Sequence, residues 1–174
     1  VPIRRRCSAG GCVVQGSGCL NYTLILSKEM RSEITSIQGS YQYIFDKIIH
    51  TLAIEGLATQ GISDITLGDL KVSGNAQRRQ KDFILHHGTL LYNADLEQFS
   101  KYIHEPENRP DYRGCRTHRS FITNLPLKRV QLVEAIRTAF SAVPPCTTLD
   151  HALVQKTQEL VDEKYDTKEW VYRK

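Results

Sequence analysis

Three short apolar runs follow one another closely in the middle of the chain, and their spacing constrains the fold more than any other feature. The first two runs, residues 62–67 and 70–73, are separated only by Gly68 and Asp69. A two-residue loop that begins with glycine suits a type II′ β-hairpin, which joins antiparallel strands. We expect residues 74–76 to leave this hairpin, and residues 83–92 to form a further strand. The centre of the fold is therefore predicted to be a largely antiparallel sheet.

The segment before this hairpin predicts a buried helix. Its apolar residues follow the i, i+3, i+4, i+7, i+8 spacing of one helix face, and they are Tyr41, Ile44, Phe45, Ile48, Ile49 and Leu52. Gly56 and Gly61 mark its end. Nearer the N-terminus, residues 12–14 and 20–26 are predicted to be short strands among the glycines Gly10, Gly11, Gly16 and Gly18.

The second half of the chain is predicted to be mainly helical. Asp95 can cap a short helix that carries Leu96, Phe99, Tyr102 and Ile103. Residues 105–124 predict a long polar loop. A helix is expected from Pro126 to Pro144-Pro145, and another over residues 149–164, before residues 170–172 add an edge strand or pack on the body. This order predicts the α+β class, with a mixed, mainly antiparallel sheet flanked by helices.

Length, composition and charge describe a globular chain. Its 174 residues, 40% of them hydrophobic, are expected to form one domain. We find neither an apolar run long enough to span a membrane nor a signal segment, although the chain begins at Val1 rather than Met. The net charge of +4 fits an acidic partner, while the basic residues form no tail or motif that would indicate nucleic-acid binding.

The cysteines favour a reducing compartment. There are five, an odd number, and they are Cys7, Cys12, Cys19, Cys115 and Cys146. Since none forms a Cys-x-x-Cys pair, zinc-binding spacing is absent. Scattered reduced thiols predict a cytoplasmic location and no structural metal.

Three stretches carry residue types suited to chemistry. The first is glycine-rich and follows Arg5 and Arg6, so arginine side chains and backbone N–H groups can approach a phosphate. The second places Lys71 on an apolar strand beside the small residues Gly74 and Ala76. The third contains His86 and His87, whose side chains should point to opposite faces of a strand and cannot easily share one metal. Each stretch alone is also compatible with an ordinary structural role.

Together the three stretches resemble the lipoate–protein ligase family, which is grouped with biotin ligases and octanoyltransferases. The motifs that carry the resemblance are Arg-Arg-x-x-x-Gly-Gly, Leu-Lys-Val-Ser-Gly-Asn-Ala-Gln-Arg-Arg and His-His-Gly-Thr-Leu-Leu, in this order. The resemblance extends over essentially the whole chain. It implies a catalytic domain of the biotin–lipoate ligase type, related to class II aminoacyl-tRNA synthetases. It also implies that the chain lacks its N-terminal part and any C-terminal accessory domain.

The resemblance further implies an activity and a set of site residues. Members activate lipoate or octanoate with ATP and Mg²⁺ to an acyl-adenylate, and then transfer the acyl group to one lysine of an acceptor domain. The catalytic residue would be Lys71, which contacts the α-phosphate and the acyl oxygen. The residues implied to bind nucleotide and acyl group are Arg6, Gly10, Gly11, Cys12, Val13, Val14, Lys71, Gly74, Asn75, Ala76, Gln77, His87, Gly88 and Thr89.

The implied partners are the lipoyl domains of 2-oxoacid dehydrogenase complexes or the glycine cleavage system, and an accessory protein for adenylation. The apolar acyl chain needs an apolar wall, for which residues 24–26 are candidates.

Three departures from the family pattern occur: Ala9 replaces a glycine, Gln15-Gly16 replaces a His-Asp pair, and Cys19 replaces an asparagine. Two alternatives therefore stay open. They are an ATP-independent octanoyltransferase, with Cys12 or Cys19 as nucleophile, and a non-catalytic acyl-binding relative.

Overall fold

The computed structural model describes residues 1–107, 109–142 and 148–173. The chain divides into two compact units, one formed by residues 10–142 and the other by residues 1–9 with 143–174. The expected helix stop at Pro144-Pro145 and the thiol of Cys146 lie outside the described residues.

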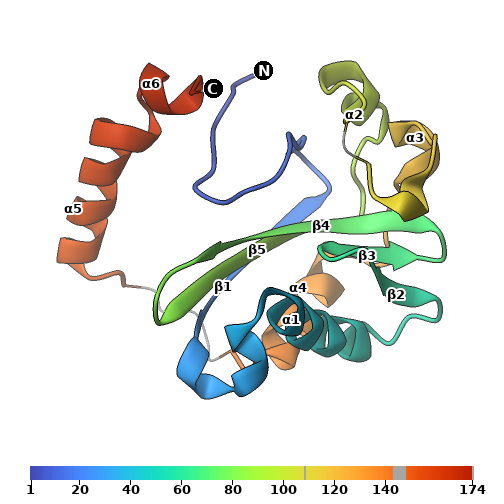
Figure 1. Cartoon of the computed structure of the whole chain (residues 1–174), viewed down its shortest axis with the longest axis horizontal. Coiled ribbons are helices and arrows are strands. Elements are labelled where there is room, and N and C mark those ends of the chain that lie inside the picture. Colours follow the sequence, from blue (N-terminus) through green and yellow to red (C-terminus); the bar gives the residue numbers. More distant parts are fainter. Residues whose placement is uncertain (108, 143–147, 174) are drawn as a thin grey trace. The chain divides into compact units, whose positions relative to one another are not determined.

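The larger unit is built on a five-stranded sheet (Figure 1). Its strands are β1 (Cys19–Ser27), β2 (Leu57–Gln60), β3 (Asp64–Leu67), β4 (Leu70–Arg79) and β5 (Phe83–Leu91). The order across the sheet is β1-β5-β4-β3-β2, and each neighbouring pair is antiparallel. The predicted fold class is confirmed, as is the hairpin between β3 and β4, where Gly68 has the positive φ that a type II′ turn requires at its first position.

Strand β4 is longer than predicted. The expectation that residues 74–76 leave the hairpin is wrong, because β4 continues to Arg79 and pairs with β5 along this extension. Asn75, Gln77 and Arg79 are polar, and asparagine is also depleted in strands. Here their polar groups find partners next to the sheet: the Gln77 and Arg79 side chains both bond to Ser40 of the first helix.

The helices are α1 (Ile37–Leu52), α2 (Glu97–Tyr102), α3 (His118–Phe121), α4 (Arg129–Ala139), α5 (His151–Leu160) and α6 (Lys168–Val171). Short 3₁₀ segments cover Lys28–Met30, Ser32–Thr35 and Asp111–Arg113, and a π-helical turn, Val161–Tyr165, continues α5. Helix α1 begins where the Ser36 hydroxyl accepts a hydrogen bond from the Gly39 amide. It ends at Ala53, which adopts the left-handed conformation at φ 49° before Gly56.

The hydrophobic core lies on one face of the sheet. Helices α1 and α4 cover this face (Figure 1). The α1 residues Ile44, Phe45 and Ile48 are buried there as predicted. Successive side chains of β1 alternate between the core face and the opposite face. Leu26 is buried against the core, whereas Ile25 on the opposite face is 69% exposed.

Four other local predictions differ from the structure. Residues 12–14 are irregular rather than a strand, and they lie between two glycines with positive φ, Gly10 and Gly18. Strand β2 was not expected. The predicted loop 105–124 contains a 3₁₀ turn and α3, and the helix expected from Pro126 begins three residues later.

The edge strand considered for residues 170–172 is also wrong. This segment belongs to α6, because the Thr167 hydroxyl accepts a hydrogen bond from the Trp170 amide and caps a helix. The helix expected over residues 149–164 is confirmed as α5 with its π-helical continuation.

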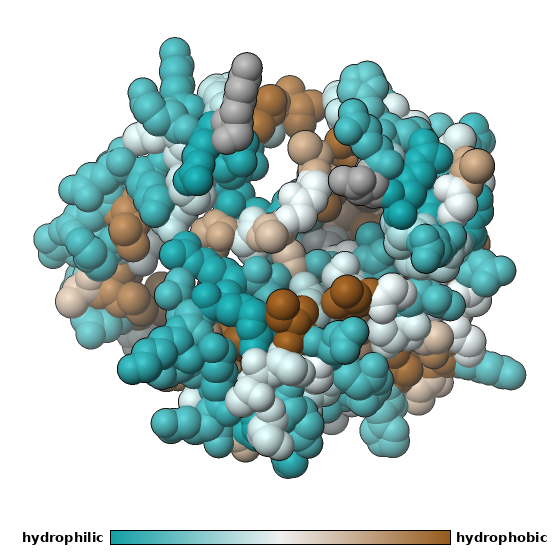
Figure 2. All heavy atoms as spheres, in the orientation of Figure 1, coloured by the Kyte–Doolittle hydropathy of each residue, from teal (hydrophilic) through white to brown (hydrophobic). Residues whose placement is uncertain are grey.

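Among the described residues, every helix is too short or too polar to cross a bilayer. On the face visible in Figure 2, hydrophobic residues are interspersed with hydrophilic ones.

Candidate active site

A row of side chains crosses four strands on the sheet face opposite α1. Asp64 of β3, Gly74 of β4, Thr89 of β5 and Asn21 of β1 are successive partners in the strand register. Residues that are direct partners across strands share one face. We call the face that carries this row the Lys71 face, for the lysine described next.

Lys71 reaches this face because of a β-bulge. Lys71 and Gly74 are three residues apart, so in a regular strand their side chains would point to opposite faces. The register with β3 shifts between Ile65 and Thr66, which leaves an extra residue in β4 at Val72. A bulge of this kind reverses the alternation and re-aims a side chain. Lys71 therefore lies on the same face as Asp64 and Gly74, while Val72 is fully buried in the core.

An ion pair holds the Lys71 ammonium over Gly74. The Lys71 Nζ lies 2.8 Å from Asp64 Oδ1, and the Asp64 side chain is only 9% exposed. A Cβ atom added to Gly74 would lie 3.2 Å from both Cε and Nζ of Lys71, so the lysine chain passes directly over this glycine. The Lys71 backbone is also fixed, because Thr123 N donates to the Lys71 carbonyl at 2.9 Å.

The second oxygen of Asp64 has a neutral donor. The Tyr112 hydroxyl donates to Asp64 Oδ2 at 2.6 Å. Burial, followed by this hydrogen bond, raises the pKa of Tyr112, so the phenol stays protonated and remains a donor at physiological pH. The sequence analysis identified neither Asp64 nor Tyr112 as a site residue. A carboxylate in a short apolar strand is a usable signal for Asp64, whereas Tyr112 lies in a segment predicted to be a loop.

The glycine-rich segment meets the other end of the row. The Gln15 side-chain amide donates to the Thr89 hydroxyl at 2.8 Å, and this hydroxyl donates to Asn21 Oδ1 at 2.6 Å. Gln15 is the residue that departs from the family pattern, and here it ties its segment to β5.

The predicted site residues divide between the two sheet faces. Lys71, Gly74, Ala76, His87 and Thr89 belong to the Lys71 face by register, with Ala76 and His87 as direct partners. The core face carries the other three, which are Asn75, Gln77 and Gly88.

Those three residues have structural partners on the core face. Asn75 Oδ1 accepts from the Tyr22 hydroxyl at 2.6 Å, and Gln77 Nε2 lies 3.1 Å from His86 Nδ1. A Cβ added to Gly88 would fall 1.7 Å from Asn75 Oδ1, so only glycine fits beneath this amide.

The two histidines face opposite sides, as predicted. His86 is fully buried among the rings of Tyr22, Tyr41 and Phe45. Burial, with a smaller contribution from His87, lowers the pKa of His86 to about 3, so it is neutral.

The remaining predicted residues lie near the N-terminus. Gly10, Gly11, Cys12, Val13 and Val14 form irregular backbone that opens the larger unit. Arg6 belongs to the other unit, where its guanidinium donates two hydrogen bonds to the Ala9 carbonyl.

The candidate nucleophile Cys19 is not activated. Its thiol is half-buried, and burial raises its pKa. A reactive cysteine requires the opposite shift, because the thiolate is the nucleophile. Cys12, by contrast, is exposed.

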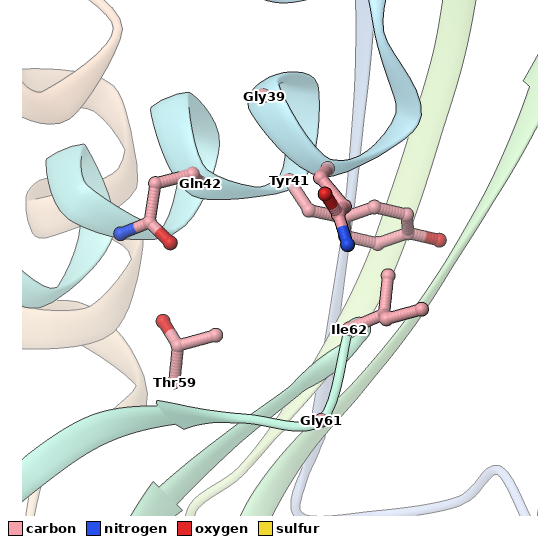
Figure 3. Close-up of a pocket in the computed structure, with 7 residues that line it drawn as sticks. Gly39, Tyr41, Gln42, Thr59, Gly61 and Ile62 are labelled. Carbon is pink, nitrogen blue, oxygen red and sulfur yellow. The ribbon is translucent and has the colours of Figure 1, made fainter.

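A hollow of about 360 Å³ lies on the other side of the sheet from Lys71, between α1 and the β2–β3 connection (Figure 3). Gln42 and Thr59 point toward each other across it, and Tyr41, Gly61 and Ile62 also line it. Over the part of the chain that is described, no three His, Cys, Asp or Glu side chains are grouped to hold a metal ion.

The Lys71 face can therefore stabilise negative charge. One fixed ammonium lies in a row with hydroxyl and amide groups that donate or accept hydrogen bonds. A donor held in place before reaction stabilises a phosphoryl group or a developing oxyanion without reorganisation.

A family model and the similar solved structures agree with one another. Residues 1–142 match the model of the lipoyl protein ligase A/B catalytic domain. The bipartite lipoate protein ligase of Thermoplasma acidophilum, studied with its E2 lipoyl domain, superposes with a TM-score of 0.80 at 22% identity, over 97% of this chain and 69% of that one. Lipoate-protein ligase A bound with ATP gives 0.77 at 23% identity, over 97% and 70% of the two chains. LipL1 of P. falciparum in complex with lipoate gives 0.67 at 24% identity, over 100% and 52%.

Proposed function

Because the chain belongs to the lipoyl protein ligase A/B catalytic-domain family, we propose that it transfers a lipoyl or octanoyl group, through an acyl-adenylate, to one lysine of an acceptor domain. The observation that carries this proposal is the Lys71 ammonium, fixed by Asp64 at 2.8 Å over a glycine. The family supplies the class of reaction, and this geometry supplies a residue able to perform it.

Lys71 would act on two successive groups. Adenylation builds negative charge on the α-phosphoryl group, and acyl transfer builds it on the carbonyl oxygen. An ammonium has three N–H donors. The ion pair with Asp64 occupies one of them, so the others can serve the phosphoryl and carbonyl oxygens. Loss of one such preorganised donor typically lowers the rate by about 10²–10³-fold.

Gly74 and Thr89 would form the floor beneath the reacting groups. Gly74 leaves room for the lysine chain, and the Thr89 hydroxyl is held by Asn21 and Gln15. The glycine-rich backbone from Gly10 to Val14 would then lie along the nucleotide, with its amides free of bulky side chains at the glycines. Arg6 would bind phosphate oxygens, as a guanidinium does well.

The acyl chain would extend along the same face. Ile25 and Leu85 are direct partners two rows away from Asn21 and Thr89, and Ile25 is exposed there. Strand residues rise about 3.3 Å each, so this apolar pair lies about 13 Å from the row that contains Thr89. An eight-carbon acyl tail is shorter than this distance, so it would extend toward this apolar pair without spanning the whole separation. Leu24 and Leu26, on the opposite face, pack in the core instead.

ATP would enter as a substrate accompanied by Mg²⁺. Mg²⁺ usually keeps several waters and binds through one or two carboxylates together with substrate phosphates. The described residues group no three metal-binding side chains, so Mg²⁺ would be held mainly by the phosphates of ATP and by water. Bound Mg²⁺ would neutralise phosphate charge.

The acceptor would be a lipoyl domain of a 2-oxoacid dehydrogenase complex or of the glycine cleavage system. The net charge of +4 suits an acidic partner. A separate accessory protein would be required if the chain catalyses transfer but not adenylation.

One mass-spectrometric experiment tests the proposal. The protein is incubated with a lipoyl domain and lipoate, with and without ATP and Mg²⁺, and the mass of the domain is followed. We expect a gain of one lipoyl group that depends on ATP, or, if an accessory protein is needed, a gain only from synthetic lipoyl-adenylate. Modification only from octanoyl acyl carrier protein would contradict the ligase proposal, and so would no gain from any donor.

A further inference from the structure

The Asp64 carboxylate accepts two short hydrogen bonds from donors of different character, besides a longer one of 3.4 Å from the Ser63 hydroxyl to Oδ1. Its Oδ1 accepts from the Lys71 ammonium at 2.8 Å, and its Oδ2 accepts from the Tyr112 hydroxyl at 2.6 Å. A carboxylate that is bonded through both oxygens cannot rotate without breaking one of these bonds. Because Asp64 is the ion-pair partner of Lys71, a fixed orientation of Asp64 also fixes the ammonium.

Tyr112 is itself held firmly. Its ring packs on the Phe121 ring with 5.3 Å between centroids. Its carbonyl accepts a hydrogen bond from the Arg116 guanidinium, which also donates to the Asp69 carbonyl at 2.8 Å. Asp69 lies in the β3–β4 turn, two residues before Lys71. The segment that carries Tyr112 is thus tied to the same hairpin that carries the lysine.

A buried arginine anchors the rest of this segment. Arg113 is 5% exposed, its guanidinium pairs with the Glu105 carboxylate, and it lies 4.6 Å above the Phe121 ring. Glu105 also accepts a hydrogen bond from the His118 amide at 2.8 Å. These contacts hold the described residues 105–107 and 109–122 together, with Tyr112 directed at Asp64.

We propose that Tyr112 is a positioning residue that orients Lys71 through Asp64. The role of this lysine rests on the function proposed above, whereas the geometric link does not. Tyrosine suits the task because a neutral donor steadies the carboxylate without offering a second cation that would compete with Lys71 for it. Without the hydroxyl, Asp64 can turn, and the ammonium then loses its fixed place over Gly74.

The first test is the rate of transfer. Tyr112→Phe keeps the ring that packs on Phe121 and removes only the hydroxyl. We expect the single-turnover rate of transfer from synthetic lipoyl-adenylate to a lipoyl domain to fall about tenfold, as for a modest misplacement of a reacting group. The matched control is Tyr43→Phe, which removes the hydroxyl of a partly buried tyrosine elsewhere, on α1. This variant should transfer the acyl group like the wild type.

A double variant separates positioning from a general structural effect. In an Asp64→Asn background, Tyr112→Phe should lower the rate no further, because the link it acts through is already broken. If the two substitutions lower the rate independently, so that their effects multiply, Tyr112 does not act through Asp64.

The second test needs no activity. Acetic anhydride labels lysine amines, and peptide mass spectrometry gives the labelling rate of Lys71 against that of an exposed lysine, Lys156. We expect Tyr112→Phe and Asp64→Asn each to raise the relative labelling of Lys71 about fivefold, as expected for loss of an ordinary hydrogen bond. Thermal melting verifies that both variants are folded.

The outcomes distinguish this inference from the proposed function. Faster labelling in a protein that transfers no acyl group supports the positioning role and refutes the ligase activity. Unchanged labelling of Lys71 in Tyr112→Phe overturns the positioning role, whatever the transfer rate. Faster labelling with a wild-type transfer rate overturns it as well, because the position of Lys71 would then not matter to the reaction.

Discussion

Substituting Gly74 by alanine should separate the activity of this protein from its stability. Gly74 lies in β4 directly beneath the Lys71 side chain, and its φ lies outside the left-handed range, so alanine can adopt its backbone conformation. A glycine-to-alanine change at a compatible position stabilises a protein by about 0.4–1 kcal/mol, because the unfolded chain loses conformational freedom. For a chain of this size, that corresponds to a rise in Tm of about 1–4 °C.

The added methyl group has a second effect. It would lie 3.2 Å from Cε and Nζ of Lys71, closer than ordinary contact, so the end of the lysine chain must move by a few tenths of an ångström. This movement draws the ammonium away from the 2.8 Å contact with Asp64. Since a misplacement of about 1 Å can cost about a hundredfold in rate, we expect a shift of this size to lower acyl transfer about tenfold.

The two effects are measured on one preparation. Differential scanning calorimetry gives Tm, and single-turnover transfer from lipoyl-adenylate gives the rate. We expect a slower enzyme that melts at the same or a higher temperature. A wild-type rate would refute the placement of the reacting group above Gly74, and a lower Tm together with a lower rate would attribute the loss to misfolding instead.

Three further predictions follow from the core face and the thiols. Gly88→Ala should destabilise the fold by about 2 kcal/mol or more in denaturant melts, since its methyl group would overlap Asn75 Oδ1 at 1.7 Å; wild-type stability would contradict this packing. Burial lowers the pKa of His86 from 6.5 to about 3 in the folded protein. Between these two pH values the imidazole is protonated in the unfolded chain and neutral in the folded chain, so the free energy of unfolding decreases as the pH falls below about 6.5. Between about pH 7.5 and 5 the wild type should lose about 2 kcal/mol more than His86→Gln, and parallel curves would refute a neutral buried His86. Cys12→Ser and Cys19→Ser should retain transfer activity from lipoyl-adenylate; loss in either would favour a cysteine nucleophile.

The β3–β4 hairpin and helix α1 could be predicted because local signals agree with the fold. Gly68 and Asp69 set the hairpin, and the α1 face shows its 3.6-residue period over about three turns. The polar half of β4 could not be predicted. Gln77 and Arg79 show no apolar strand pattern, and the partner that their side chains share, Ser40, is distant in sequence.

The candidate site was predictable only in part, for a related reason. Lys71 was recognisable as a charged residue on an apolar strand, but its position over Gly74 depends on a bulge that no local residue pattern announces. The position of Tyr112 depends on long-range contacts of its segment with Asp64 and with Asp69 in the β3–β4 turn. The irregular segment around Tyr112 shows no hydrophobic periodicity, so only the structure reveals that its side chain reaches Asp64.

Removal of the charge of Lys71 tests the central claim most directly. Lys71→Met keeps a linear side chain over Gly74 but removes the ammonium. Lys156→Met removes an ammonium that is also paired with a carboxylate, at 2.9 Å, but in an exposed position. In single-turnover transfer from synthetic lipoyl-adenylate to a lipoyl domain, we expect Lys71→Met to be slower by about 10²–10³-fold and Lys156→Met to match the wild type. A Lys71→Met variant that transfers at the wild-type rate would contradict the account.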